Sequence, residues 1–305
     1  RENRVFGELL GIYEREIMFY REFGDSQALQ IPKPYYSEFD RDKGSEKQAQ
    51  ILSLLDRLPL FMVHWVNSIG SKIAASKNRR YILLIEDLSF MEPGDQVKGL
   101  NPEGCIQVLR GIAKMHHQYW QSSVLENHFW LLPIDIDARL RFGVFNDHVE
   151  DFRKTSSKTF EPHLQALQTA GPNFLRDFFV STPTTLIHCD LRLDNILFEG
   201  DNCKYIDWQL TRSGPAAYDV AYFLSSALPV ETTNKELESV LRDYHRSLNI
   251  ENYSYEDLQT DYARGLRMVL LNLTHTGDVE LGDDRGKKMM DIWIERLLAR
   301  LEQAH

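Results

Sequence analysis

Apolar residues recur every three or four positions along most of this chain, which is the spacing of one buried face of an α-helix. Near the start, Leu9, Tyr13 and Ile17 fall on such a face. Asn101 followed by Pro102 is a typical helix start, with Asn as the cap and Pro at the first helical position. The pattern predicts helices over residues 1–23, 45–58, 60–75, 101–119, 236–248, 255–273 and 287–302, and one or two helices within 142–179, interrupted at Gly171-Pro172.

Fewer segments have the pattern of strands. Residues 81–88 form an almost continuous apolar run, which predicts a buried strand. Residues 184–187 are β-branched or apolar and lead into a loop. Two further short apolar runs, 195–198 and 203–206, are separated by residues 199–202, which have the composition of a turn. The last two runs therefore predict a hairpin.

Candidate chemistry is concentrated around this hairpin. Asp190 lies in the loop before it, Asn195 opens its first strand and Asp207 follows its second strand. Because the second strand folds back beside the first, we expect Asp207 to come close to Asn195 and Asp190. This set suits phosphoryl transfer, since Asp190 can accept the proton of an attacking hydroxyl while Asn195 and Asp207 can hold Mg²⁺ on a nucleotide. Arg192 can offset charge on the transferred phosphate, and His188 is expected to support the loop by hydrogen bonding.

The stretch from His188 to Asn195, with Asp207-Trp208-Gln209 behind it, resembles the kinase-like phosphotransferases. This broad family includes aminoglycoside phosphotransferases, choline kinases and ecdysteroid-kinase-like proteins. The chain is most similar to a bacterial subgroup with His-Gly-Asp-x-Arg-Leu-Asp-Asn and Asp-Trp-Gln, although it has Cys189 where Gly is usual. The resemblance implies ATP and Mg²⁺ as cofactors and a hydroxyl-bearing small molecule as the acceptor substrate.

The resemblance also implies an α+β, protein-kinase-like bilobal fold. Residues 1–88 would be the remainder of an N-terminally incomplete small lobe, with a helical insertion at about 45–77. Residues 89–305 would form the large, mostly helical catalytic lobe. The insertion is compatible with a cap over the cleft, a dimer surface or core packing.

Further roles follow from the same resemblance. Glu16, with Glu14 as the competing candidate, would pair with a lysine that holds the nucleotide phosphates. The segment Glu86-Asp87-Leu88 would be the hinge between the lobes and would offer backbone groups to adenine. Asp219 would brace the catalytic loop. The position of the C-terminal helices suggests candidates for the acceptor pocket, namely Trp208, Gln209, Tyr222, Arg264, His275 and Asp278.

Two expected features are missing. The chain contains no Gly-rich phosphate loop, and no residues precede the first helix to supply the lysine partner of Glu16. We expect that N-terminal strands have been cut away, and the alternative is a pseudokinase or binding module without transfer activity. A protein kinase is disfavoured, because no segment ending in Ala-Pro-Glu follows Asp207.

Composition excludes some classes of partner. The net charge is −10, from 35 basic and 45 acidic residues, which disfavours nucleic-acid binding. The three cysteines show neither paired nor metal-ligand spacing, which favours a reducing, cytoplasmic setting. No apolar run approaches the ~20 residues of a membrane span, and no signal peptide is visible. The acceptor stays open among aminoglycosides, choline-like amines, sugars, steroids and hydroxy acids, and so does the oligomeric state.

Overall fold

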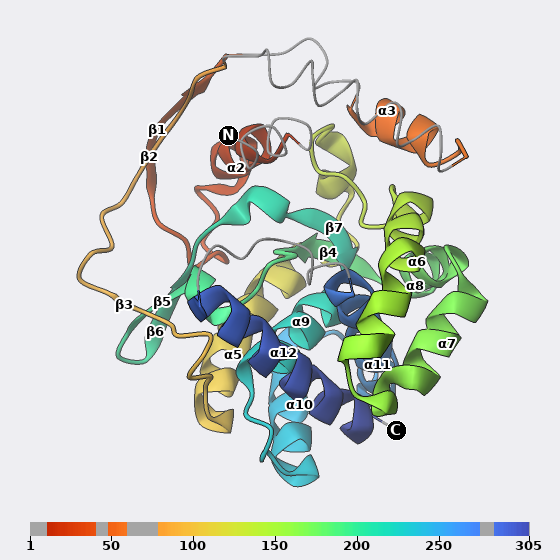
Figure 1. Ribbon diagram of the computed structural model, residues 1–305. Coiled ribbons are helices and arrows are strands. Elements are labelled where there is room, and N and C mark those ends of the chain that lie inside the picture. Colours follow the sequence, from red (N-terminus) through yellow and green to blue (C-terminus); the bar gives the residue numbers. More distant parts are fainter. Residues whose placement is uncertain (1–10, 41–47, 60–78, 275–283, 305) are drawn as a thin grey trace.

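The computed structural model (Figure 1) describes residues 11–40, 48–59, 79–274 and 284–304. Its described helices are α2 (Ile12–Phe23), α3 (Gln48–Leu55), α5 (Pro102–Gln118), α6 (Ala138–Thr155), α7 (Glu161–Ala170), α8 (Asn173–Ser181), α9 (Ala216–Ala227), α10 (Asn234–Leu248), α11 (Tyr255–Leu273) and α12 (Asp284–Gln303). The described strands are β1 (Pro34–Phe39), β2 (Tyr81–Ile85), β3 (Glu92–Pro93), β4 (Thr184–Ile187), β5 (Ile196–Glu199), β6 (Asn202–Tyr205) and β7 (Arg212–Pro215).

The strands form three small antiparallel sheets, with the orders β1-β2, β3-β5-β6 and β4-β7. The hairpin predicted near residue 200 is confirmed as β5 and β6, with Glu199 paired to Asn202. Gly200 in its turn has φ 56°, a left-handed conformation that glycine adopts without a Cβ clash. The β4–β7 pair lies beside this hairpin and leads into the loop that carries Asp190 (Figure 1).

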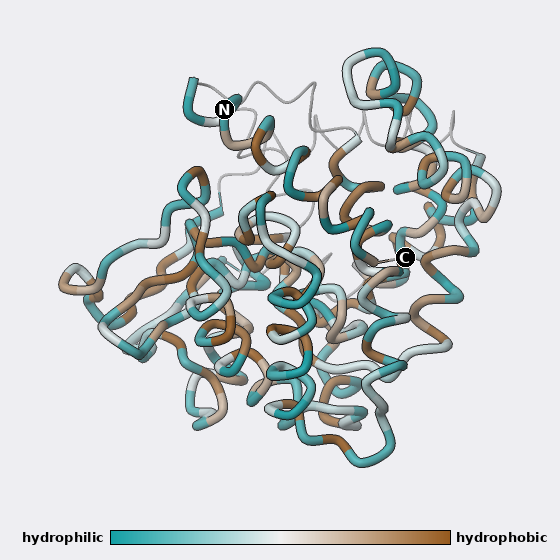
Figure 2. The backbone as a smooth tube through the Cα atoms, turned by 90° about the horizontal axis from the view of Figure 1, so that it is seen from below, coloured by the Kyte–Doolittle hydropathy of each residue, from teal (hydrophilic) through white to brown (hydrophobic). Residues whose placement is uncertain are grey.

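In the helical part of the chain, α10 packs on α5, and α9 packs against α5, α11 and α12. As predicted, α5 begins after Asn101, whose side chain accepts a hydrogen bond from the Gly104 N–H at 2.9 Å. The helices α9, α10, α11 and α12 gather beside α5 (Figure 1), and α9 is buried along nearly its whole length. Hydrophobic and hydrophilic positions alternate along the helical parts of the chain (Figure 2), and α10, α11 and α12 each bury an apolar face. None of the described helices is long and apolar enough to cross a lipid bilayer.

Two predicted features need correction. The segment 142–179 holds three helices instead of one or two: Ser156 ends α6 before the turn that leads to α7, and Pro172 separates α7 from α8. Helix α6 also begins earlier than predicted, at Ala138. The strand at 81–85 is not buried, since Ile82 and Leu84 are half-exposed on one face of the two-stranded β1–β2 sheet. On α3, Ile51 and Leu54 also face solvent. The helices predicted over 60–75 and before residue 11 lie outside the described residues.

The close packing of α9 against α11 depends on Gly265. A Cβ at this position would lie 2.8 Å from the Cβ of Ala221 and 2.9 Å from the carbonyl oxygen of Ala217. Gly265→Ala should therefore lower the free energy of unfolding by about 1–3 kcal/mol in urea titrations, because overpacking forces the helices apart. The exposed Gln259→Ala on the same helix is the control and should stay within about 0.5 kcal/mol of the parent. Equal stability of Gly265→Ala and the parent would contradict this packing.

Candidate active site

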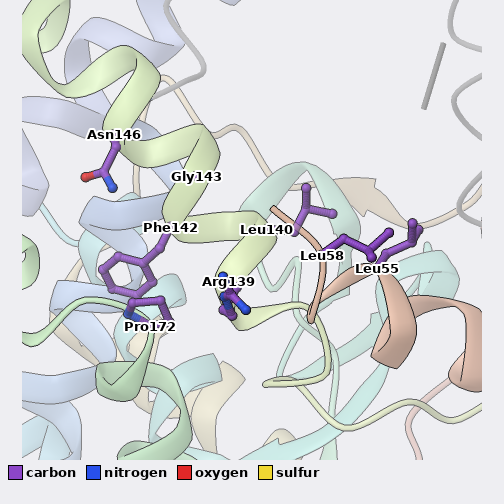
Figure 3. Close-up of a pocket in the computed structure, with 8 residues that line it drawn as sticks. All are labelled: Leu55, Leu58, Arg139, Leu140, Phe142, Gly143, Asn146 and Pro172. Carbon is purple, nitrogen blue, oxygen red and sulfur yellow. The ribbon is translucent and has the colours of Figure 1, made fainter. Parts of the chain in front are cut away.

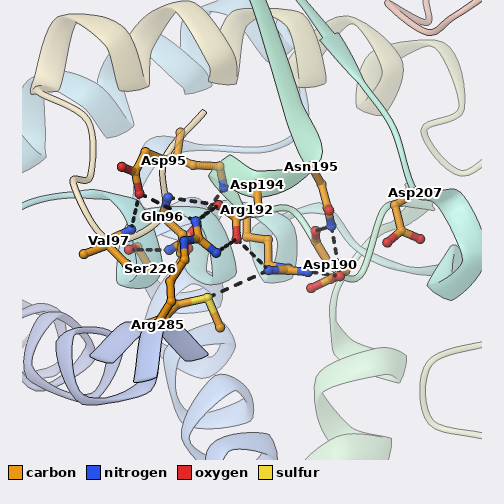
Figure 4. A network of polar contacts seen from close by, with 12 residues as sticks. Asp95, Gln96, Val97, Asp190, Arg192, Asp194, Asn195, Asp207, Ser226 and Arg285 are labelled. Carbon is orange, nitrogen blue, oxygen red and sulfur yellow. Dashed lines mark hydrogen bonds and ion pairs between the residues drawn. The ribbon is translucent and has the colours of Figure 1, made fainter. Parts of the chain in front are cut away.

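The β5–β6 hairpin brings Asp190, Asn195 and Asp207 into one place, as predicted (Figure 4). The side-chain amide of Asn195 donates to the carboxylate of Asp190 and to its backbone oxygen, both at 2.9 Å. The backbone N–H of Ile206 donates to the carbonyl of Asn195 at 3.0 Å. This bond keeps the backbone just before Asp207 beside Asn195. Asp207 itself has φ 66°, a left-handed turn at the end of β6 that directs the chain away from the strand.

The carboxylate of Asp190 is almost fully buried and is bonded at both oxygens. Its Oδ1 accepts a hydrogen bond from the Tyr222 hydroxyl at 2.6 Å. Its Oδ2 accepts from Asn195 and, at 3.3 Å, from Nε of Arg192. Tyr222 was placed near the acceptor by sequence position alone, and the structure puts its hydroxyl on the candidate base.

Negative charge accumulates around Asp207. Burial raises the pKa of Asp207, and the charge of Asp190 raises it further. Glu16 on α2 approaches the same place and accepts the backbone N–H of Trp208. Burial first, and then the charge of Asp207, raises the pKa of Glu16 to about 7. These carboxylates repel one another, so a cation bound among them would stabilise their ionised forms.

The donor set fits Mg²⁺. The Asn195 amide nitrogen is used on Asp190, which leaves its Oδ1 as a hard oxygen ligand beside the Asp207 carboxylate. Mg²⁺ in phosphotransfer sites needs one or two protein oxygens, because water and phosphate oxygens complete its shell. The described residues contain no group of three or more His, Cys, Asp or Glu side chains suited to a metal, and this two-residue site does not require one.

Glu14 and Glu16, the two candidates on α2 between which the sequence did not decide, have different surroundings in the structure. Glu14 forms an ion pair with Arg79, with 3.0 Å between Oε2 and Nη1. Glu16 is directed to the segment that carries Asp207. Of the two glutamates, Glu16 is therefore the one that lies beside the candidate active site.

Asp219 fixes the backbone of the two residues before Asp190 through hydrogen bonds. Its fully buried carboxylate accepts the backbone N–H groups of His188 at 2.7 Å and Cys189 at 3.0 Å. The ring of His188 contacts the carbonyl of Ile206 at 3.0 Å and so connects the loop to the end of the hairpin. Cys189 has φ 66°, the left-handed conformation for which glycine is the usual residue, and the two bonds to Asp219 keep the loop in this strained form.

Trp208, which was an acceptor-pocket candidate by sequence position alone, is part of the core. Its indole is fully buried, stacks on Phe19 of α2 with ring centroids 4.1 Å apart, and donates its N–H to the carbonyl of Tyr205. This stack joins α2 to the turn after Asp207. Gln209, in contrast, lies beside Asp207: its side-chain amide nitrogen is 3.3 Å from Oδ2 of Asp207.

The segment Glu86-Asp87-Leu88 continues directly from β2, as expected of a hinge. The Glu86 side chain forms an ion pair with Lys204, and its backbone N–H donates to the carbonyl of Lys33 at 2.8 Å. Asp87 accepts the Ser89 N–H at 2.9 Å. In the described part of the chain no backbone hydrogen bond reaches the Glu86 carbonyl or the Leu88 N–H.

A polar network that the sequence did not predict fixes the other side of the loop (Figure 4). Asp194 accepts from Arg192 at 3.3 Å and from Arg285 of α12 at 3.0 and 3.2 Å. Gln96 accepts the Leu193 N–H at 2.7 Å and donates to the Ser226 carbonyl at 2.6 Å. The only sequence signal for this network was Asp194 inside the Arg-Leu-Asp-Asn motif.

The remaining acceptor-pocket candidates are Arg264, His275 and Asp278. Arg264 bonds Ser181 and Asp261, away from Asp190. His275 and Asp278 lie outside the described residues. An apolar cavity of about 160 Å³ lies between α3 and α6 (Figure 3) and contains no candidate catalytic residue. It is lined by Leu55, Leu58, Arg139, Leu140, Phe142, Gly143, Asn146 and Pro172.

Comparison with known proteins gives the following matches. Residues 13–258 match the profile of a phosphotransferase enzyme family. The chain is 20% identical over 269 residues to an uncharacterized kinase-like protein of Caenorhabditis elegans; the match covers 84% of this chain and 62% of that protein, so this chain spans less than two thirds of the length of that relative.

Among solved structures, choline kinase LicA from Streptococcus pneumoniae is 12% identical with a TM-score of 0.48, covering 94% of this chain and 80% of that one. An aminoglycoside phosphotransferase from Alicyclobacillus acidocaldarius is 15% identical with a TM-score of 0.43, covering 90% and 92%.

The raised pKa of Glu16 predicts a pH effect on stability in the absence of Mg²⁺ and nucleotide. An unfolded Glu titrates near pH 4.5 and folded Glu16 near 7, so its contribution to stability is present below pH 4.5 and is lost as the pH rises through 7. Gln cannot ionise, so Glu16→Gln should be more stable than the parent at pH 8, by on the order of 2–3 kcal/mol, and should lose this advantage by pH 4.5.

Urea titrations across this pH range in EDTA measure the difference. The exposed Glu295→Gln is the control for loss of a surface charge. A Glu16→Gln advantage that does not change with pH would show that Glu16 does not lie among buried carboxylates.

Proposed function

Because this chain belongs to the phosphotransferase enzyme family and has its kinase-like α+β fold, we propose that it transfers the γ-phosphate of ATP to a hydroxyl of a small molecule, with Mg²⁺ as cofactor. The observation that carries this proposal is the cluster of Asp190, Asn195 and Asp207 around the hairpin. Phosphotransfer needs little from a protein beyond positioning and charge neutralisation, and this cluster supplies both.

In this proposal Asp190 orients the acceptor hydroxyl and takes its proton as the acceptor oxygen bonds to the γ-phosphorus and ADP leaves. The Tyr222 hydroxyl, 2.6 Å from Oδ1 of Asp190, makes the contact that an acceptor hydroxyl would make. Arg192, bonded to Asp190 and Asp194, is placed to offset charge on the transferred group.

Asn195 and Asp207 are the proposed ligands of Mg²⁺, which when bound neutralises phosphate charge. Glu86 and Leu88 receive adenine through backbone groups, with Asp87 fixing the turn between them. The lobes divide after this hinge, into residues 1–88 and 89–305. The proposed partner is a small hydroxyl-bearing molecule in a cytoplasmic setting.

Asp190→Asn should lower kcat by about 10²–10⁴-fold, because it removes the proton acceptor, while the affinity for Mg·ATP stays close to that of the parent. ADP formation with an acceptor panel and calorimetric titration with a non-hydrolysable ATP analogue measure the two quantities. The matched control is Asp201→Asn, an exposed aspartate in the hairpin turn, which should match the parent in both.

Turnover by Asp190→Asn at the parent rate would remove the role given to Asp190. Binding of Mg·ATP by the parent without ADP formation from any acceptor would instead support the alternative that the missing Gly-rich loop suggests, a nucleotide-binding module without transfer.

A further inference from the structure

Three arginines gather on the side of the catalytic loop where Cys189 lies, and the proposed chemistry does not use them. Arg141 on α6 and Arg212 at the start of β7 both pair with Asp137, with Nε of Arg141 at 2.8 Å from Oδ1 and Nη2 of Arg212 at 3.3 Å from Oδ2. No other described carboxylate lies within ion-pair distance of either guanidinium. Two cations therefore share one anion.

Arg15 on α2 adds a third guanidinium to this arginine cluster, defined as Arg15, Arg141 and Arg212. Arg15 bonds the carbonyl of Gln209, three residues before Arg212, and burial and then the charge of Arg212 lower the pKa of Arg15 to about 9. Burial alone would raise the pKa of Asp137, but Arg141 and Arg212 outweigh burial and lower this pKa to about 2. Asp137 is thus ionised at neutral pH in a strongly positive surrounding.

The cluster lies along the loop that carries the candidate base. Arg212 pairs with Ile187 in the β4–β7 sheet, three residues before Asp190. Arg15 donates to the carbonyl of Gln209, two residues after Asp207, at 3.1 Å. Three residues span at most roughly 10 Å even when fully extended, and Cys189 in this stretch is in a left-handed turn, so the distance from Asp190 to the cluster is within the reach of one small molecule.

The cluster also retains groups that a ligand can use. The side chains of Arg141 and Arg212 are 23% and 10% exposed, so they are partly accessible to solvent. Arg141 donates from Nε to Asp137 and from Nη1 to Asn272, and Arg212 donates from Nη1 to the Pro133 carbonyl. Nη2 of Arg141 and Nε of Arg212 make no hydrogen bond to any described residue.

We propose that the arginine cluster binds a carboxylate carried by the acceptor substrate while the acceptor hydroxyl lies on Asp190. This inference rests on the proposed phosphotransfer function and narrows its substrate class to hydroxy carboxylates. Guanidinium groups match carboxylates in geometry and charge, and the cluster already holds one carboxylate, that of Asp137, with Arg141 donating to Oδ1 and Arg212 to Oδ2. The same charge repels an amine, so cationic acceptors are disfavoured in a protein whose overall charge is −10.

A set of acceptors with one chain length and three charges tests this proposal on the full-length protein. The probes are 6-hydroxyhexanoate, 1,6-hexanediol and 6-amino-1-hexanol, and the readouts are ADP formation and the shift in Tm in the presence of Mg²⁺ and a non-hydrolysable ATP analogue. We expect 6-hydroxyhexanoate to give the largest Tm shift and a kcat/KM about tenfold or more above that of the diol, with the amino alcohol lowest.

Arg141→Gln should raise the KM for 6-hydroxyhexanoate about tenfold to a hundredfold and remove the preference over the diol, with the Mg·ATP affinity unchanged. Arg141→Lys keeps the charge but lacks the planar guanidinium group, so its KM for 6-hydroxyhexanoate should fall between those of the parent and Arg141→Gln. Arg242→Gln, an exposed arginine on α10 paired with Glu238, is the matched control and should behave as the parent.

Equal Tm shifts from all three probes, shifts from none of them, or a preference for the diol or the amino alcohol would overturn the carboxylate site. An unchanged preference in Arg141→Gln would overturn it as well. These results are distinct from failure of the proposed function, which would appear as no stabilisation by Mg·ATP and no ADP formation from any acceptor.

Discussion

Repulsion between buried carboxylates is the physical constraint on this site. Asp190, Asp207 and Glu16 come from a loop, a strand end and a helix that are far apart in sequence, and each adds negative charge to one partly desolvated place. Gathering like charges in this way costs free energy, which is reflected in the raised pKa values of Asp207 and Glu16. Hydrogen bonds from Asn195, Tyr222 and Arg192 offset part of this cost at Asp190. A divalent cation bound there would offset the remainder, so the electrostatic cost and the proposed chemistry would have the same origin.

The surrounding structure keeps these charges in place through buried contacts. Asp219 fixes the backbone before Asp190, the stack of Phe19 on Trp208 fixes the turn after Asp207, and Asp194 connects the loop to Arg285 of α12. The contacts come from different parts of the chain, so small changes in the packing of α2 or α12 would move the site. The arginine cluster extends this arrangement along the same loop, with positive charge at one end and negative charge at the other. This polarity is what an acceptor with a hydroxyl and a carboxylate would match.

The sequence predicted the local elements well and the long-range pairings poorly. The hairpin and the start of α5 follow from turn and capping residues, whose effects are local. The position of Asp207 beside Asp190 was predicted because a hairpin fixes the relation between its two ends. The burial of residues 81–85 was predicted wrongly, because an apolar run gives no information on how many strands cover it. The core position of Trp208 and the sharing of Asp137 by Arg141 and Arg212 depend on partners distant in sequence, which periodicity does not encode.

Electron paramagnetic resonance of bound Mn²⁺ tests the central claim most directly, since Mn²⁺ prefers the same oxygen ligands as Mg²⁺. Titration of the parent protein with Mn²⁺ in the presence of a non-hydrolysable ATP analogue should show one tightly held ion. Asn195→Ala and Asp207→Asn should each weaken its binding by more than roughly tenfold, the cost of losing even an outer-shell contact to a metal site. Binding in both variants as tight as in the parent would show that the hairpin does not assemble a metal site.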